Sequence, residues 1–399
     1  MKNNIIIDYP NILDKIFDKL KNYGIKPIIV GGYVRDFFLN SISNKKQILT
    51  KDIDIELYNA CSFEKIQEIL IEFGNSNIIG KSFGVIKLKV DNLEIDFSMP
   101  RVENKIAKGH KGFLVDTYSK LDFKTAASRR DFTINSIGYD IFNKKILDPF
   151  NGLQDISNKV LKSVNEKTFI EDPLRVLRAM QFYSRFDFTP DKNLITLCTN
   201  MCENKLLNEL PKERVYEEFK KLFLKSNKPS LGLKFLKNIN ANIYFNELNM
   251  NEKDWNDSLK FIDNIDKTIL DDEANILITL ALLCYKMKKN NRESFINKLT
   301  NKKNVLNKLE AIYHIDIFLE NINQKNNTLK YNILKDINLK LLIQYLKAKN
   351  TSTNVIEKIR YIKPTIHGNN LLDIGMKQSK DFSSILQLLY EIRINSIFI

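Results

Sequence analysis

Asp52 and Asp54 are the residues whose types and spacing most clearly indicate chemistry. Side chains alternate between the two faces of a β-strand, so both carboxylates would project from one face while Ile53 and Ile55 enter a core. Two anionic groups held side by side repel each other unless a cation lies between them. Mg²⁺ takes hard oxygen ligands and is typically held by one or two carboxylates together with substrate phosphates. The pair therefore predicts a magnesium site, and the alternative is a solvated pair on an edge strand.

A glycine turn precedes this pair. Residues 28–30 are predicted to form a strand, Gly31 and Gly32 a turn, and Val34 the opening of a helix. Such a turn lets backbone N–H groups approach a phosphate at the N-terminus of the helix. Alone the signal is weak, because a strand-turn-helix needs glycine for its own geometry. Its value depends on the motifs that follow it.

A third carboxylate is expected from a neighbouring strand. Residues 85–90 and 93–98 alternate between apolar and polar side chains around Asp91-Asn92, which predicts a tight hairpin. On the second arm, Glu94 and Asp96 share the face opposite to the apolar side chains. Asp96 is therefore the candidate third catalytic carboxylate, and a polar neighbour without a ligand role is an equal alternative.

A polar, basic segment follows at residues 100–116. Its charge and its two glycines, Gly109 and Gly112, predict a mobile loop.

Composition limits the class of protein. A chain of 399 residues with no apolar run near eighteen residues and no signal-peptide pattern predicts a cytoplasmic protein of two to four domains. The four cysteines include no Cys-x-x-Cys pair, so neither disulfides nor structural zinc is expected. The net charge of +14 favours a polyanionic partner, with nucleic acid first, although solubility or a bias toward Lys and Asn could contribute.

Arginine carries more information than the total charge. Only 11 of the 62 basic residues are Arg, and eight of them lie in the first 214 residues. In a chain that otherwise uses Lys, a guanidinium suggests a need for its planar fork, which suits phosphates and base edges.

From about residue 160 onward the patterns become mostly helical. Asp172 is predicted to cap a helix that has Pro173 at its first position and carries Arg175 and Arg178. Further helices are expected at residues 211–225, 230–238, 256–287, 303–321, 329–348 and 380–392. The Asn/Lys tracts near 286–305 and 322–328 are predicted to be solvated connections.

Five segments in order resemble the motifs of class II tRNA nucleotidyltransferases and bacterial poly(A) polymerases. They are Gly31-Gly32-Tyr33-Val34-Arg35-Asp36, Asp52-Ile53-Asp54, Arg129-Arg130-Asp131-Phe132-Thr133-Ile134-Asn135, Glu171-Asp172-Pro173-Leu174-Arg175-Val176-Leu177-Arg178 and Leu210-Pro211-Lys212-Glu213-Arg214-Val215. The resemblance is dense over residues 28–225, thin over 226–360, and returns at the tail around His367-Gly368.

The resemblance implies an α+β fold. A polymerase-β-like nucleotidyltransferase head, a mixed sheet with helices, would occupy residues 1–155. An all-helical neck with a nucleotide-recognition motif would occupy 156–225, and a helical body and tail that bind tRNA would occupy 226–399.

The resemblance also implies roles for the motif residues. Asp52 and Asp54 would bind two metal ions, and Asp172 and Arg175 would face the Watson–Crick edge of the incoming base. A carboxylate accepts from the exocyclic amino group that C and A both present, so such a pair could admit C and A selectively. Capping alone is the alternative for Asp172. The full set of expected nucleotide-binding residues is Gly31, Gly32, Arg35, Arg130, Asp131, Asn135, Asp172, Arg175, Arg178 and Gln181.

The expected activity is template-independent addition of CCA to the 3′ acceptor end of tRNA from CTP and ATP, with Mg²⁺ as cofactor and no membrane or obligate protein partner. Alternatives are A-only or CC-only addition, poly(A) polymerase activity, or a non-catalytic tRNA-binding protein. Structural supporting pairs with Glu217 or Glu218 are favoured for Arg214. Residues 43–49 look like an insertion relative to the family. With only three His residues in the chain, the metal site of an appended phosphohydrolase domain is not expected.

Overall fold

The computed structural model describes residues 6–43, 52–79, 84–105, 113–117, 121–320, 338–354 and 363–396. Contacts between Cα atoms divide the chain into two compact units. Unit 1 comprises Met1–Glu218 and Lys234–Tyr244, and unit 2 comprises Phe219–Leu233 and Phe245–Ile399. The division into head, neck and body remains a prediction. The expected insertion near 43–49 lies almost entirely outside the described residues.

Among the described residues of unit 1, seven strands form one mixed sheet in the order β3-β4-β5-β2-β1-β8-β9. The β2 and β5 strands run parallel and the other neighbours run antiparallel. The strands are β1 (Lys26–Val30), β2 (Asp52–Tyr58), β3 (Asn75–Ile79), β4 (Val85–Val90), β5 (Leu93–Ser98), β8 (Gly138–Asp140) and β9 (Lys145–Leu147). The predicted mixed sheet of an α+β protein is confirmed.

The carboxylate strand β2 lies inside this sheet, between β1 and β5. Its apolar residues Ile53, Ile55 and Leu57 are buried, while Asp52 and Asp54 reach solvent, as strand alternation predicts. Because β2 is hydrogen-bonded on both edges, the alternative of a solvated pair on an edge strand does not apply.

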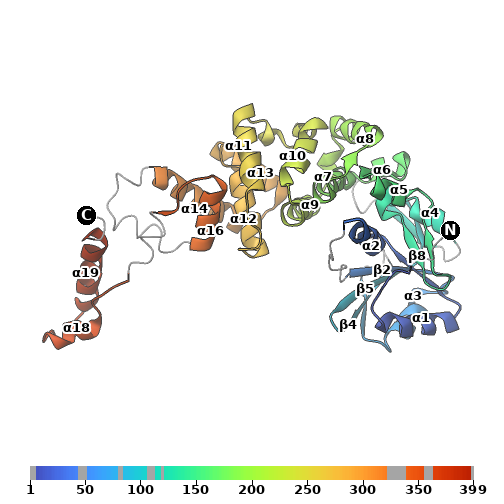
Figure 1. Ribbon diagram of the computed structural model, residues 1–399, viewed down its shortest axis with the longest axis horizontal. Coiled ribbons are helices and arrows are strands. Elements are labelled where there is room, and N and C mark those ends of the chain that lie inside the picture. Colours follow the sequence, from blue (N-terminus) through green and yellow to red (C-terminus); the bar gives the residue numbers. More distant parts are fainter. Residues whose placement is uncertain are drawn as a thin grey trace. The chain divides into compact units, whose positions relative to one another are not determined.

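Helices pack around the sheet, as Figure 1 shows for those following β1 and β2. A pair of them, α1 and α3, contact each other and the sheet, and α2 follows the glycine turn at the end of β1. The helices of this part are α1 (Ile12–Asn22), α2 (Gly32–Ser43), α3 (Phe63–Leu70), α4 (Phe123–Ala127), the 3₁₀ turn η1 (Thr133–Asn135) and α5 (Gly152–Ser157).

Part of the predicted mobile loop at 100–116 is instead regular structure. The strands β6 (Arg101–Lys105) and β7 (Phe113–Thr117) form an antiparallel pair in which Arg101 lies opposite Thr117. The residues at the two ends of the segment favour β-structure, and their backbone N–H and C=O groups pair across the two strands. The high charge of the segment had favoured a loop. Residues 106–112, with both glycines of the prediction, lie outside the described residues.

The remainder of unit 1 is mostly helical and includes a short parallel pair, β10 (Val160–Leu161) with β11 (Thr189–Pro190). The helix α7 buries the face that carries Val176, Leu177 and Met180. The other elements are α6 (Glu166–Glu171), α7 (Leu174–Phe186), α8 (Lys192–Glu203), η2 (Leu206–Glu209) and η3 (Ala241–Ile243), with α9 (Lys212–Lys225) and α10 (Pro229–Asn238) divided between the units.

Unit 2 is helical wherever it is described. Edge-to-face contacts among Phe219, Phe245 and Phe295 form part of its core, with ring centroids 5.4, 6.0 and 6.1 Å apart. Its elements are η4 (Asn246–Leu248), α11 (Glu252–Asp263), α12 (Asp272–Leu283), α13 (Lys289–Leu299), α14 (Lys303–Glu320), α16 (Leu339–Ala348), α18 (Gly368–Asp373) and α19 (Phe382–Ser396).

Two helix predictions in unit 2 were wrong. The single helix expected at 256–287 is two helices, because Asp271 accepts a hydrogen bond from the Ala274 N–H at 2.8 Å and starts α12 afresh. The tract near 286–305, expected to be a solvated connection, contains α13, which buries Phe295 and Leu299. The tract at 322–328 lies outside the described residues. None of the helices in the described ranges is long and apolar enough to cross a membrane.

Candidate functional site

Several carboxylates lie on two adjacent strands of the seven-stranded sheet. In the parallel pairing of β2 and β5, Asp54 lies directly opposite Asp96, and Asp52 opposite Glu94. Desolvation by the surrounding protein raises the pKa of the Asp54 carboxyl. The positive charge of Arg130 lowers this pKa, but the negative charges of Asp96, Glu56 and Asp52 raise it further, so that it lies above its usual value. Because the neighbouring carboxylates disfavour the ionised form of Asp54, a bound cation would stabilise this group of negative charges.

The carboxylates fit a divalent cation by their chemistry and by their shared face, with Asp52 and Asp54 as the residues that would hold it. Asp96 is engaged differently, since its Oδ2 lies 3.4 Å from the Nζ of Lys87 on β4. Across the described ranges, no group of three or more His, Cys, Asp or Glu side chains is arranged to hold a metal ion unaided. An ion here would take its further ligands from water and substrate oxygens.

Gly31, at the end of β1, leaves room for two charged groups. Its φ of +69° is in the left-handed region, and a Cβ at this position would lie 2.9 Å from Arg130 Nη1 and 3.6 Å from Asp54 Oδ2. The residue is therefore required both by backbone conformation and by close packing. Gly32, by contrast, begins α2, and a Cβ there would meet only Arg35 Nη2, at 3.5 Å.

A Gly31→Ala variant is expected to lose about 1–2 kcal/mol of stability from the left-handed backbone and, in addition, to displace Arg130. Gly24→Ala is a matched control, because Gly24 has the same φ of +69° but no atom within 4 Å of its Cβ position. Thermal unfolding of Gly24→Ala should show the backbone strain alone, and Gly31→Ala should lose at least as much stability. Only Gly31→Ala should also weaken Mn²⁺ binding at the carboxylates, and equal binding by both variants would contradict a role for the space at Gly31.

The guanidinium of Arg130 is held beside the carboxylates by a buried acid. Its Nη2 donates to Glu56 Oε1 at 2.7 Å, and its Nη1 donates to the carbonyl of Asn135 at 3.3 Å. Glu56 is only 1% exposed and also accepts from the Tyr58 hydroxyl at 2.9 Å. Burial raises the pKa of Glu56, but the nearby Arg130 and Arg129 guanidiniums outweigh it, so the group is held ionised.

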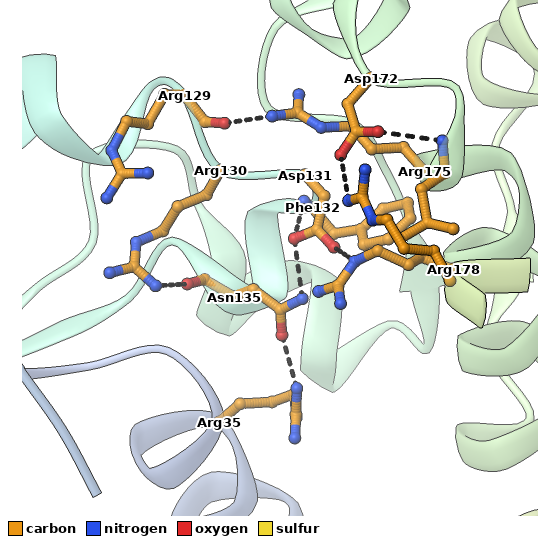
Figure 2. A network of polar contacts seen from close by, with 11 residues as sticks. Arg35, Arg129, Arg130, Asp131, Phe132, Asn135, Asp172, Arg175 and Arg178 are labelled. Carbon is orange, nitrogen blue, oxygen red and sulfur yellow. Dashed lines mark hydrogen bonds and ion pairs between the residues drawn. The ribbon is translucent and has the colours of Figure 1, made fainter. Parts of the chain in front are cut away.

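Asp131 and Asn135 link this arginine to the helix α7 (Figure 2). Asn135 Nδ2 donates to Asp131 Oδ1 at 2.9 Å, and Arg178 Nε donates to Asp131 Oδ2 at 2.6 Å. Although burial raises the pKa of Asp131, the charge of Arg178 and the hydrogen bond from Asn135 lower it below its usual value. The contacts join η1 of the head to α7.

Arg35 is part of the same network from another side. Its Nη1 donates to Asn135 Oδ1 at 2.6 Å, its Nε donates to Asp36 Oδ1 at 2.8 Å, and its guanidinium lies over the Phe186 ring at 4.7 Å. The side chain is buried among these partners. This geometry holds Asn135 in place, whereas contact between Arg35 and a triphosphate stays a prediction.

The 3₁₀ turn that carries Asn135 rests on α5. A Cβ at Gly152 would lie 2.3 Å from the Thr133 carbonyl oxygen, and Thr133 Oγ1 donates to Asp155 Oδ2 at 2.6 Å. Asp148 accepts from the Gly152 and Leu153 N–H groups at 2.7 and 2.9 Å. The segment after the Arg-Arg-Asp motif therefore fixes the position of the 3₁₀ turn that carries Asn135.

Asp172 caps the start of α7, and it also binds an arginine that the sequence assigned elsewhere. Its Oδ1 accepts from the Leu174 N–H at 3.1 Å, and its Oδ2 accepts from Arg214 Nη2 at 3.2 Å. Arg214 therefore has a supporting role, as expected, and Asp172 is one of the residues that it contacts. No sequence signal joined these positions, because they lie 42 residues apart.

Two other residues expected to contact the nucleotide, Arg175 and Gln181, have different surroundings. Arg175 Nη2 donates to the Arg129 carbonyl at 2.6 Å, next to Asp172 in Figure 2. Gln181 is only 2% exposed, and its Oε1 makes no hydrogen bond within the described ranges. The structure therefore brings Asp172, Arg175 and Arg178 to one end of α7 and buries Gln181 behind them.

A mixed sheet with paired carboxylates on a central strand, a glycine turn beside them and an arginine network behind them defines a nucleotidyltransferase-type head. Residues 28–162 match the model of the poly A polymerase head domain. This part of the chain is therefore similar to that domain family, which confirms for it the resemblance seen in the sequence.

Individual relatives extend the comparison. The CCA-adding enzyme of Buchnera aphidicola subsp. Baizongia pistaciae is 33% identical over 230 residues, which are 57% of this chain and 51% of that protein. The chain spans about half the length of this curated relative.

Solved structures match nearly the whole chain. The Thermotoga maritima CCA-adding enzyme complexed with tRNA has a TM-score of 0.73 at 20% identity, covering 98% of this chain and 92% of that one. CCA-adding enzyme structures with ATP and with CTP have TM-scores of 0.72 at 19% identity, with the same coverage. At these identities the likeness shows the fold.

Proposed function

We propose that the protein is a template-independent RNA nucleotidyltransferase that adds CCA to the 3′ acceptor end of tRNA from CTP and ATP. The observation that carries the proposal is the position of Asp54 beside Asp52 on one strand and opposite Asp96 on the next, within a matched head domain. Curated relatives named CCA-adding enzyme, and structural neighbours with tRNA, ATP and CTP, support the substrates.

The chemistry follows from the charges at the site. Nucleotidyl transfer requires an attacking 3′-hydroxyl to be aligned with the α-phosphate while charge develops on the departing pyrophosphate. Nucleotidyltransferases of this family use a divalent metal, and we propose Mg²⁺, held by Asp52 and Asp54, as the ion that neutralises this charge. Arg130, beside Asp54 and Gly31, is positioned to contribute a second positive charge to the phosphates.

Base selection is proposed for Asp172 and Arg175 at the start of α7. The two hydrogen bonds that Asp172 accepts leave lone pairs on its carboxylate, which can accept from the exocyclic amino group of C or A. Arg214 and the Leu174 N–H would then act as fixed supports that aim the carboxylate. Cytoplasmic location and independence from protein partners stay predictions from the sequence.

The decisive experiment uses purified protein with Mg²⁺ and tRNA that ends at the discriminator base. CTP alone should extend the product by two residues, ATP alone should not extend it, and both together should give the full CCA end. Extension by A on a tRNA that already ends in CC, but never by C, would replace the proposal with A-only addition. Long A tails on unrelated RNA would replace it with poly(A) polymerase activity.

An Asp172→Asn variant should lose selectivity while keeping its fold. The amide oxygen still caps Leu174, but the amide nitrogen donates where the carboxylate accepted, so discrimination against UTP and GTP should fall by about 10- to 100-fold. The measurement is kcat/KM for each of the four NTPs, with thermal unfolding as the stability control. Unaltered selectivity would return Asp172 to the capping role alone.

A further inference from the structure

Glu56 is a buried carboxylate whose role neither the predicted chemistry nor the fold explains. It is two residues after Asp54 on β2, and it contacts Arg130, Arg129 and Tyr58. A buried ion pair seldom stabilises a fold more than well-packed apolar residues would, so its presence invites a specific explanation.

The neighbours of Arg130 suggest that explanation. Arg130 has two acidic groups within reach, since its Nη1 and Asp54 Oδ2 both lie close to the single Cβ position of Gly31. Only Glu56 receives a hydrogen bond from the guanidinium, at 2.7 Å through Nη2, while Nη1 is turned to the Asn135 carbonyl. The arginine is thus fixed near Asp54 without pairing with it.

We propose that Glu56 is a positioning residue that restrains Arg130 from pairing with Asp54 and so keeps the Asp54 carboxylate available for a divalent cation. Tyr58 assists by donating to Oε2 and fixing the orientation of the Glu56 carboxylate. Arg129, whose Nη2 lies 3.6 Å from the same oxygen as Arg130, supplies further positive charge to the buried acid. The inference rests on the proposed function only in assigning a cation to Asp54.

The consequence concerns what happens when Glu56 loses its charge. In Glu56→Gln, the Arg130 guanidinium loses the anionic partner that restrains it, and the carboxylate that remains beside it, across Gly31, is Asp54. Pairing with Asp54 would compete with the cation. We expect cation binding at the carboxylates to weaken about tenfold, which corresponds to ~1.4 kcal/mol.

The experiment measures Mn²⁺ binding to the full chain by electron paramagnetic resonance, without nucleotide or RNA. Binding that disappears in Asp52→Asn/Asp54→Asn defines the site and removes background from other acidic groups. Glu56→Gln should weaken that binding, and Tyr58→Phe should weaken it less because the charge of Glu56 remains. Glu68→Gln, which removes an exposed carboxylate paired with Lys65 on α3, is the matched control for a lost charge.

A second comparison separates positioning from the loss of negative charge near the ion. If Glu56 acts through Arg130, then Glu56→Gln should have little effect in an Arg130→Met background, and the two substitutions should be strongly non-additive. If it acts only through its charge, the effects should add, and the proposal is overturned. Thermal unfolding of each variant identifies any that fail to fold, and Glu56→Asp provides a variant that keeps the charge.

The outcomes also separate this inference from the function on which it rests. Wild-type protein without Mn²⁺ binding at the carboxylates would overturn both. Wild-type binding that Glu56→Gln leaves unchanged would overturn the role of Glu56 alone.

Discussion

Replacing Asp54 with alanine is expected to reduce the rate of nucleotide addition by about 10³-fold or more. The loss of a proposed metal ligand removes several kcal/mol of charge stabilisation from the transition state, and each 1.36 kcal/mol is a factor of ten in rate. Asp52→Ala should have a similar effect, and the double variant little more, because the two residues act as one unit. The measurement is single-turnover addition of C to tRNA that lacks CCA.

The thermal stability of Asp54→Ala should not fall with its activity. Asp54 lies among the negative charges of Asp96, Glu56 and Asp52, so its removal relieves like-charge repulsion, and the melting temperature should stay the same or rise. An exposed aspartate on α1, Asp18, provides the control as Asp18→Asn, which should change neither quantity. Full activity in Asp52→Ala/Asp54→Ala would eliminate the metal mechanism at these carboxylates, whereas wild-type protein that binds tRNA without extending it would favour the non-catalytic, tRNA-binding alternative.

The second large effect is on stability and is expected from Asp131→Asn. The substitution keeps the shape of the side chain but places an amide donor opposite Arg178 Nε, which leaves the guanidinium without its carboxylate. Breaking a fully buried ion pair costs about 3–5 kcal/mol. Because the Arg178 side chain is 30% exposed and water can solvate it, roughly 2–3 kcal/mol is expected here. Denaturant unfolding measures the loss.

The pH dependence of stability provides an independent check on Asp131. Its pKa is lowered in the folded protein, so the unfolded chain binds the proton more readily. The stabilising contribution is therefore complete above the unfolded pKa of about 3.9 and is lost as pH falls through the folded value. Asp131→Asn should lose stability at neutral pH and should show a shallower decline with acid. A double-mutant cycle with Arg178→Met should recover most of the cost as coupling energy.

Local periodicity was sufficient to predict much of the head. The alternation around Asp52 and Asp54 and in the hairpin at 85–98 predicted three strands, β2, β4 and β5, because a side-chain period of two is a property of the backbone itself. The same rule placed Asp96 on the polar face of its strand. The parallel register that sets it opposite Asp54 could not follow from that rule, since pairing depends on how distant strands meet.

Predictions failed where charge or tertiary contacts outweighed local pattern. The basic segment at 100–116 contains a strand pair, and the Asn/Lys tract near 286–305 contains α13 with a buried face. In α13 the apolar residues Phe295, Ile296 and Leu299 are buried, whereas β6 and β7 pair their backbone groups with each other. The composition of a whole segment does not reveal such individual positions, so the many polar residues of these segments led to a prediction of solvent exposure.

The sequence by itself determined the chemical types at the site, the strand that carries the paired carboxylates, and the motif order that indicates a nucleotidyltransferase. Tertiary structure decided which charges neutralise which: Arg130 with Glu56, Arg178 with Asp131, Arg214 with Asp172, and Arg35 with Asp36. The reason is physical. Local conformation depends on neighbours along the chain, whereas the pairing of charges depends on distances in space and on burial, which only the folded arrangement sets.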